Sequence, residues 1–114
     1  MKPDLLAYLG RRVLVRVECP LGSVHPPHPN IVYPINCGEL PGTVSGDGYP
    51  IDAYLLVWPE PIQEVWGTVI AVIVRHDDTE DRRVAARPGT GWTHEEIINA
   101  TRFQDRYFQT ALAR

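Results

Sequence analysis

The segment 66–75, WGTVIAVIVR, constrains the fold of this chain more than any other. Its apolar residues would occupy both faces of a strand, with Val69 and Ile73 on one face and Ile70 and Val74 on the other. A strand that is apolar on both faces has to be covered on both sides, so we expect it to be central. The chain has 114 residues, which favours a single domain over residues 1–114.

Three further segments have strand character. Residues 12–19 alternate, with three valines on one face and mainly polar residues on the other, which is typical of a half-buried strand. Residues 51–58 predict a second strand. Residues 81–87 predict an antiparallel partner for segment 66–75, joined to it through an acidic loop.

The remaining segments predict loops and one helix. Residues 20–34 hold five of the 11 prolines, and we expect an extended loop there because each proline fixes φ and removes a donor. Residues 38–49 are a glycine-rich turn region. Thr93 and Glu96 form a capping-box pattern, which predicts a helix near 94–112. The fold class is therefore mainly β with α: a small, closed, largely antiparallel barrel with one C-terminal helix.

Composition excludes several classes of protein. The net charge of −3 argues against a nucleic-acid binder, which would be basic. No segment reaches the roughly 18 apolar residues of a membrane span, and the N-terminal segment lacks the pattern of a signal peptide. Cys19 and Cys37 do not make a disulfide framework, so we expect two free thiols and a cytoplasmic location.

Two acidic clusters are the candidate site. Asp47 and Asp52 lie in SGDGYPID, directly before a predicted strand, and Asp77 and Asp81 lie in DDTED, directly after one. Hard cations such as Mg²⁺ bind through oxygen ligands, and clustered carboxylates repel one another unless a cation holds them. The sequence therefore indicates a Mg²⁺ site. The competing interpretation is a solvated Asp-Gly turn and a polar hairpin loop.

The order of these pieces resembles the soluble inorganic pyrophosphatases, whose barrel is of the oligonucleotide-binding (OB) type. The resemblance runs over roughly residues 13–88 and is carried by VECP at 17–20, YPINCGELPGT at 33–43, GDGYPID at 46–52, GTVI at 67–70, the loop 77–83 and VAA at 84–86. The signature of that family is D-G-D-P-x-D. This chain reads DGYPID, with Tyr49 in place of the middle aspartate.

The resemblance implies roles for the acidic residues. Asp47, Asp52 and Asp81 correspond to ligands of one Mg²⁺, and Asp77 to a ligand of a further one. Asp47 and Asp52 are the expected catalytic residues. A tyrosine at position 49 is a poor general base, since its ordinary pKa is near 10. Loss of such a base typically costs about 10²- to 10⁴-fold in rate.

The resemblance also implies substrate-binding residues, and it shows that several phosphate-binding residues of the family are replaced in this chain. The positions that correspond to phosphate contacts, or could replace them, are Glu18, Tyr33, Arg83, Tyr107 and His25. His25 falls near a phosphate-clamping arginine and would carry positive charge only when protonated. A second tyrosine of the site falls on Cys37 and a lysine falls on Phe108. We expect no room before Tyr33 for the hairpin that supplies another lysine.

The resulting hypothesis is weak, Mg²⁺-dependent hydrolysis of inorganic pyrophosphate or a related phosphoanhydride, in a protein whose family resemblance is compatible with a homo-oligomer. The alternative is a non-catalytic module that keeps the Mg²⁺–phosphate pocket as a ligand sensor or an interaction surface. A third hypothesis, a binder of single-stranded nucleic acid, is disfavoured by the acidic balance and the absence of a basic, aromatic stripe.

Overall fold

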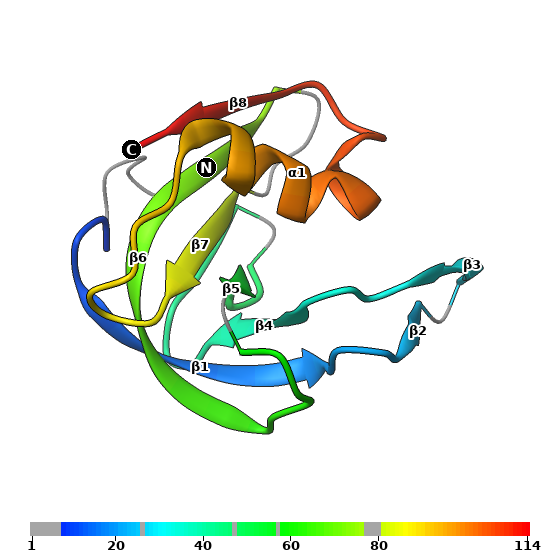
Figure 1. Cartoon of the computed structure of the whole chain (residues 1–114), viewed down its shortest axis with the longest axis horizontal. Coiled ribbons are helices and arrows are strands. Elements are labelled where there is room, and N and C mark those ends of the chain that lie inside the picture. Colours follow the sequence, from blue (N-terminus) through cyan, green and yellow to red (C-terminus); the bar gives the residue numbers. More distant parts are fainter. Residues whose placement is uncertain (1–7, 26, 47, 57, 77–80) are drawn as a thin grey trace.

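Five strands close into a barrel in the computed structural model, which describes residues 8–25, 27–46, 48–56, 58–76 and 81–114 (Figure 1). In spatial order they are β1 (Arg12–Cys19), β4 (Asn36–Leu40), β5 (Ile51–Leu56), β7 (Arg82–Ala86) and β6 (Glu64–Arg75), which pairs back with β1. Only β5–β7 is parallel among these pairs. The predicted closed, OB-like, largely antiparallel barrel is confirmed.

Strand β6 is the longest element and has three partners along its length. Its first residues pair with β1, its middle with β7, and its last four residues with β8 (Thr110–Ala113). Val69, Ala71, Val72 and Ile73 are buried. The prediction of a central strand is therefore confirmed.

The two faces of the sheet belong to two apolar clusters. Along β5, Ala53 and Leu55 pack in one cluster with Val15 of β1, while Tyr54 and Leu56 pack in the other. The second cluster includes Ile97 of the helix α1 (His94–Asp105), so it lies between the sheet and α1. The first cluster, on the opposite face, is the inside of the barrel.

The helix begins as predicted and ends earlier. The side chain of Thr93 accepts a hydrogen bond from the Glu96 amide at 3.1 Å, and the Glu96 side chain accepts one from the Thr93 amide at 2.9 Å. The predicted continuation to residue 112 is wrong, because α1 ends at Asp105 and the chain turns to form β8 on the edge of β6. Among the described residues, no helix has the length and apolar character to cross a membrane.

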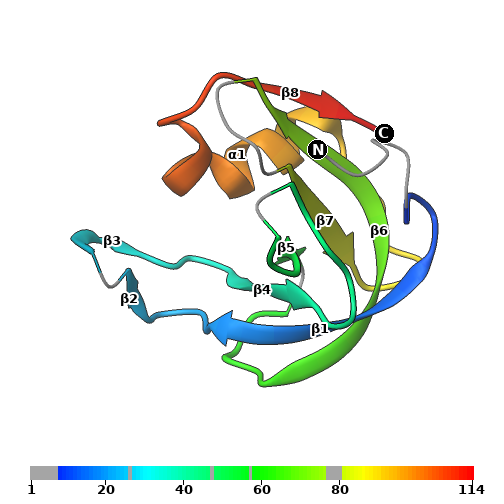
Figure 2. The same ribbon diagram turned by 180° about the vertical axis from the view of Figure 1, so that it is seen from behind.

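Two segments predicted as loop or turn contain strands. Within 20–34, β2 (Val24–His25) and β3 (His28–Val32) form a two-stranded hairpin that projects from the barrel (Figures 1 and 2). A proline is tolerated in β3 because both strands of such a ribbon are edge strands. The predicted loop over 20–34 is therefore wrong in part, since a short hairpin is present before Tyr33, although its sequence contains no lysine.

The second missed strand is β4, within the glycine-rich region. Its central Gly38 faces the backbone of β1 so closely that an added Cβ would lie 2.8 Å from the Cα of Val17. The glycine is required there for close strand approach and does not mark a turn.

Candidate functional site

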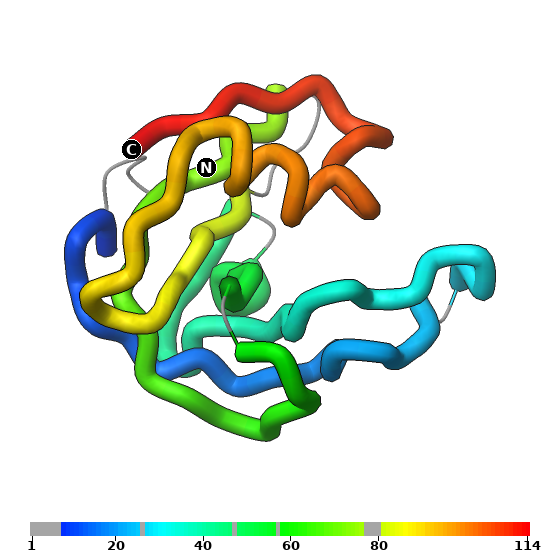
Figure 3. Tube along the Cα trace, viewed as in Figure 1, coloured from blue at the N-terminus to red at the C-terminus, as the bar shows by residue number. Residues whose placement is uncertain are grey.

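A polar pocket of about 240 Å³ opens on the face of the sheet that α1 covers. Its walls include Glu18 and Cys19 at the end of β1, Asp52 of β5 and Arg82 of β7. Asp52 shares a face with Tyr54 because side chains alternate along a strand, and Arg82 shares that face with Val84 for the same reason. We call this the acidic pocket. The tube trace in Figure 3 follows the backbone of these strands and of the hairpin.

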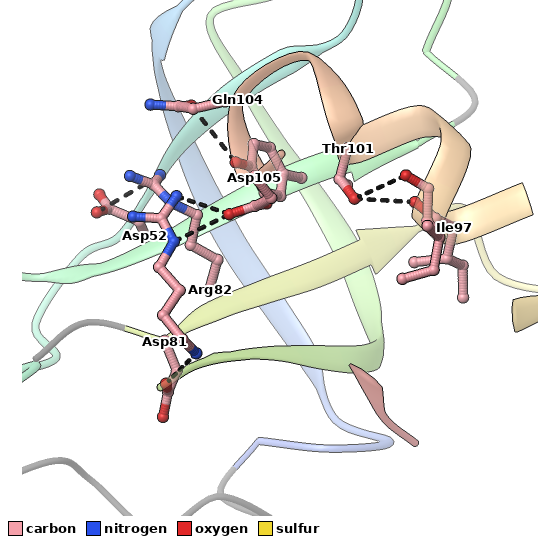
Figure 4. A network of polar contacts seen from close by, with 10 residues as sticks. Asp52, Asp81, Arg82, Ile97, Thr101, Gln104 and Asp105 are labelled. Atoms are coloured by element: carbon pink, nitrogen blue, oxygen red, sulfur yellow. Dashed lines mark hydrogen bonds and ion pairs between the residues drawn. The ribbon is translucent and has the colours of Figure 1, made fainter. Parts of the chain in front are cut away.

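Asp52 and Arg82 form an ion pair in the acidic pocket, with 3.6 Å between Oδ2 and Nη1 (Figure 4). Both side chains keep some access to solvent, with exposed fractions of 27% and 13%. The Arg82 guanidinium also lies over the ring of Tyr54, 5.4 Å from its centre. The Tyr54 hydroxyl donates to Oε1 of Gln104 at 3.4 Å, which links the sheet to α1. The pocket therefore holds carboxylates together with one guanidinium.

More carboxylates gather beside Asp52. Glu39 lies directly opposite Asp52 in the β4–β5 pairing. Partial burial raises the pKa of Glu39, and so do the charge and a hydrogen bond of Glu18 and the charge of Asp52. Mutual repulsion of this kind marks a region of negative potential, which favours a bound cation. Glu39 was missed from the sequence because only the strand register brings it to Asp52.

His25 and Tyr33 form the outer wall of the acidic pocket and stack with 5.9 Å between ring centres. Burial lowers the pKa of His25, and the charges of His28 and Arg82 lower it further. The His25 ring therefore gains a proton less readily than an unperturbed histidine. Burial and contact with Cys19 raise the pKa of Tyr33, so its hydroxyl stays protonated and is available as a donor.

The predicted metal ligands are only partly visible in the structure. Asp47 and Asp77 lie outside the described residues. Asp81 is 4% exposed, and its Oδ1 accepts a hydrogen bond of 3.0 Å from the backbone amide of Arg75. Figure 4 shows Asp81 apart from Asp52, at the start of β7. Within the described ranges, no three acidic, imidazole or thiol side chains are grouped closely enough to hold a metal ion.

The two remaining predicted substrate contacts lie outside the acidic pocket. Arg83 is fully buried and alternates with Arg82 along β7, so it shares the face of Ala85 inside the barrel. Tyr107 is exposed beyond the end of α1, where its hydroxyl accepts from Nη2 of Arg106 at 3.0 Å. Arg82 was missed from the sequence. Val84, Ala85 and Ala86 are apolar on both faces of β7, so no local signal distinguishes Arg82 from Arg83.

Comparison with known proteins gives the fold a name. No protein-family model and no curated protein sequence matches the chain. The inorganic pyrophosphatase of Ehrlichia chaffeensis matches with a TM-score of 0.70 and 16% identity, over 92% of this chain and 86% of that one. The inorganic pyrophosphatase of Neisseria gonorrhoeae matches with a TM-score of 0.65 and 20% identity, over 91% and 81%. The chain has the inorganic pyrophosphatase fold.

A third similar structure supports the same assignment of fold. The inorganic pyrophosphatase of Helicobacter pylori matches with a TM-score of 0.62 and 16% identity, over 94% of this chain and 81% of that one. The pyrophosphatase-like barrel is thus present nearly from end to end. The acidic pocket of this pyrophosphatase-like barrel is built by β1, β4, β5 and β7. These strands contain sequence segments on which the resemblance to the pyrophosphatases rests.

Proposed function

We propose that this protein catalyses weak, Mg²⁺-dependent hydrolysis of inorganic pyrophosphate or a related phosphoanhydride in the cytoplasm. The observation that carries the proposal is the acidic pocket, where Asp52 and Arg82 meet in a barrel with the pyrophosphatase fold. In such a pocket the guanidinium can bind an anion, and the carboxylates can bind the cation that accompanies it.

The residues of the pocket divide between anion binding and charge balance. Arg82 would donate hydrogen bonds to phosphate oxygens, a contact that a guanidinium makes with two parallel N–H groups. Tyr33 would add a neutral hydroxyl donor. Glu18, Glu39 and Asp52 repel a phosphate unless their charge is compensated. The site therefore needs a cation for substrate binding as well as for chemistry.

The donors around Asp52 fit Mg²⁺ in kind, since they are carboxylate oxygens and the pKa of Glu39 is raised by its acidic neighbours. We propose Asp47, Asp52, Asp77 and Asp81 as the residues that would hold it. Bound Mg²⁺ would supply Lewis-acid polarisation of the phosphoryl group and a more acidic water. Asp52 would orient that site, and its release from Arg82 would accompany substrate binding.

The direct test is phosphate release from pyrophosphate with Mg²⁺, compared with nucleotides and sugar phosphates. Asp52→Asn should reduce the rate at least about 100-fold, the usual cost of a lost preorganised contact. Glu95→Gln removes a carboxylate on the exposed first turn of α1 and is the matched control, which should leave the rate unchanged. An Asp52→Asn variant with full activity would show that the hydrolysis occurs elsewhere.

One observation favours a second function, that of a non-catalytic Mg²⁺–phosphate sensor. The Asp52–Arg82 ion pair already neutralises a predicted metal ligand, so phosphate could bind by exchanging with Asp52 at Arg82 without any reaction. Calorimetry with pyrophosphate and Mg²⁺ separates the two functions. Binding that Arg82→Ala abolishes, with no phosphate released by the wild type, would establish the sensor.

A further inference from the structure

A second and larger pocket lies next to the acidic pocket. It measures about 500 Å³, within the range of small-molecule sites, and shares His25 and Gln104 with the acidic pocket. The β2–β3 hairpin forms one wall, and the end of α1 with the residues after it forms the opposite wall. Figures 1 and 2 show the hairpin extending from the barrel with α1 facing it. We call this the aromatic pocket.

The lining of the aromatic pocket is rich in rings and amide groups and capable of hydrogen bonding. His25 and His28 come from the hairpin with 5.0 Å between ring centres, and Tyr107 and Phe108 lie beyond α1. Asn30 and Gln104 add amide groups, which donate and accept hydrogen bonds. Among the residues that the structure describes, neither a lysine nor an arginine lines this pocket. This chemistry suits a planar heteroaromatic ring, which stacks on side-chain rings and hydrogen-bonds at its edge.

The shared residues join the two sites. His25 contributes to the wall of both pockets, and its buried Nδ1 has no hydrogen-bond partner among the described residues. A ligand that fills both pockets would pass His25. Inorganic pyrophosphate has no group that would occupy the aromatic pocket.

We propose that the aromatic pocket binds the base of a nucleoside diphosphate whose phosphoanhydride lies in the acidic pocket. This inference rests on the proposed function and assigns its substrate class. In the reaction, the oxygen of water bonds to the terminal phosphorus while the bond from that phosphorus to the bridging oxygen breaks. The products are a nucleoside monophosphate, phosphate and one proton, so atoms and charge balance.

The test compares ADP with pyrophosphate as substrates and adenosine methylenediphosphonate with methylenediphosphonate as non-hydrolysed ligands, all with Mg²⁺. The nucleotide forms should have about 5- to 150-fold better kcat/KM and affinity, since stacking of one base contributes roughly 1–3 kcal/mol. His28→Ala and Asn30→Ala should remove most of that advantage and leave values for the base-free compounds unchanged. Neither residue lines the acidic pocket.

The outcomes separate this inference from the proposed function. Hydrolysis of pyrophosphate and ADP with equal kcat/KM, unaffected by His28→Ala, overturns the aromatic pocket and leaves the hydrolase intact. Tight binding of adenosine methylenediphosphonate that depends on His28, without any phosphate release, supports the pocket and overturns the hydrolase. Failure to bind either diphosphonate overturns both.

A separate observation concerns the two cysteines. Cys19 of β1 and Cys37 of β4 are partners across the antiparallel pair, next to an irregularity of register between Val17 and Cys19, and both line the acidic pocket. Opposed residues of antiparallel strands have Cα atoms about 4.5–5.5 Å apart, within the 4.4–6.8 Å that a disulfide spans. Both cysteines are free thiols in the structure, with Cys37 buried and Cys19 half-buried.

We infer that Cys19 and Cys37 form a reversible disulfide when the protein meets a low-molecular-weight disulfide oxidant. The thiolate of Cys19, the more accessible cysteine, attacks one sulfur of the oxidant and releases one thiol. The thiolate of Cys37 then attacks the sulfur of Cys19 and releases the second thiol. The protein loses two electrons and two protons, and the oxidant is reduced to two thiols. Burial raises the pKa of Cys37, so this second step should quicken as pH rises.

Oxidised glutathione followed by alkylation and intact-mass measurement tests this inference. The wild type should become a monomer lighter by two hydrogens, with no alkylated cysteine, and a reductant should reverse the change. Cys37→Ser should stop at a glutathione adduct on Cys19. Two alkylated thiols after oxidation, or a disulfide only between two chains, would overturn the pairing.

Discussion

The guanidinium of Arg75 and the carboxylate of Asp105 form a buried ion pair that fastens the end of β6 to the last turn of α1. Oδ1 of Asp105 lies 2.9 Å from Nε and 2.8 Å from Nη2 of Arg75. The same guanidinium lies 3.8 Å from the centre of the Phe108 ring, just beyond the helix. The pair thus fixes the part of the chain that forms one wall of the aromatic pocket.

Removing one partner of this pair should destabilise the fold strongly. Asp105→Ala leaves a buried guanidinium without its carboxylate, a change that typically costs about 3–5 kcal/mol. Denaturant unfolding measures the loss. Arg102→Ala, on the exposed face of the same helix, should change the free energy of unfolding by less than about 0.5 kcal/mol. Similar losses for both variants would contradict the role of the ion pair.

Restoring the carboxylate of the family signature should raise activity. Tyr49 is 72% exposed, so Tyr49→Asp should not disturb the fold. A general base typically contributes about 10²- to 10⁴-fold, and we expect at least a several-fold increase in phosphate release with Mg²⁺. Tyr49→Phe removes only the hydroxyl and should give no increase. An unchanged rate in Tyr49→Asp would show that this position does not serve the reaction.

Gly38 should not tolerate any side chain. A Cβ there would lie 2.8 Å from the Cα of Val17, so Gly38→Ala forces β1 and β4 apart and should cost about 1–3 kcal/mol or more. Gly91 has nothing within 4 Å of an added Cβ, and Gly91→Ala is the matched control with little expected change. Thermal unfolding of the two variants compares the sites. Equal melting temperatures would contradict the close strand approach.

The capping box should make stability depend on pH. Hydrogen bonds with the backbone and side chain of Thr93 lower the pKa of Glu96. A depressed carboxyl pKa stabilises the fold above the ordinary pKa of the unfolded chain, and this contribution is lost as pH falls through the lower folded value. The stability difference between wild type and Glu96→Gln should therefore be largest near neutral pH and disappear as the pH falls below the lowered pKa of Glu96.

Glu95→Gln controls for the loss of a charge in the same turn of α1. Denaturant unfolding across that pH range would reveal the dependence. The same difference between wild type and Glu96→Gln at every pH would rule out a capping role for the charged form.

The sequence was sufficient where the signal is local. Strand-like segments of the sequence predicted β1, β5, β6 and β7, and the Thr93–Glu96 spacing predicted the start of α1. It was insufficient where the structure depends on contacts between residues that are far apart in the sequence. The end of α1 depends on β8 pairing with β6 and on Asp105 meeting Arg75, partners far along the chain. The short β2–β3 hairpin was hidden by prolines, which normally argue against strands.

Some residues of the candidate site could also be predicted from the sequence, and others could not. Glu18, Tyr33, His25 and Asp52 were found from the sequence and line one pocket. Arg82 and Glu39 were missed because strand register, which a single sequence does not fix at β4 and β7, brings them to Asp52. Choosing between adjacent Arg82 and Arg83 needs knowledge of which face of β7 meets the helix.

The pairing of β1 with β6 also sets how this chain folds. The two strands that close the barrel come from opposite halves of the sequence, with Arg12 paired to Thr68 and Arg16 to Glu64. The long intervening segment must lose conformational entropy before the contacts between β1 and β6 form and lower the free energy. Folding should therefore be slow, on the order of milliseconds to seconds, as in other barrels with mostly non-local contacts. During synthesis, the barrel cannot close until β6 has left the ribosome and can pair with β1. The acidic pocket can form only after that point.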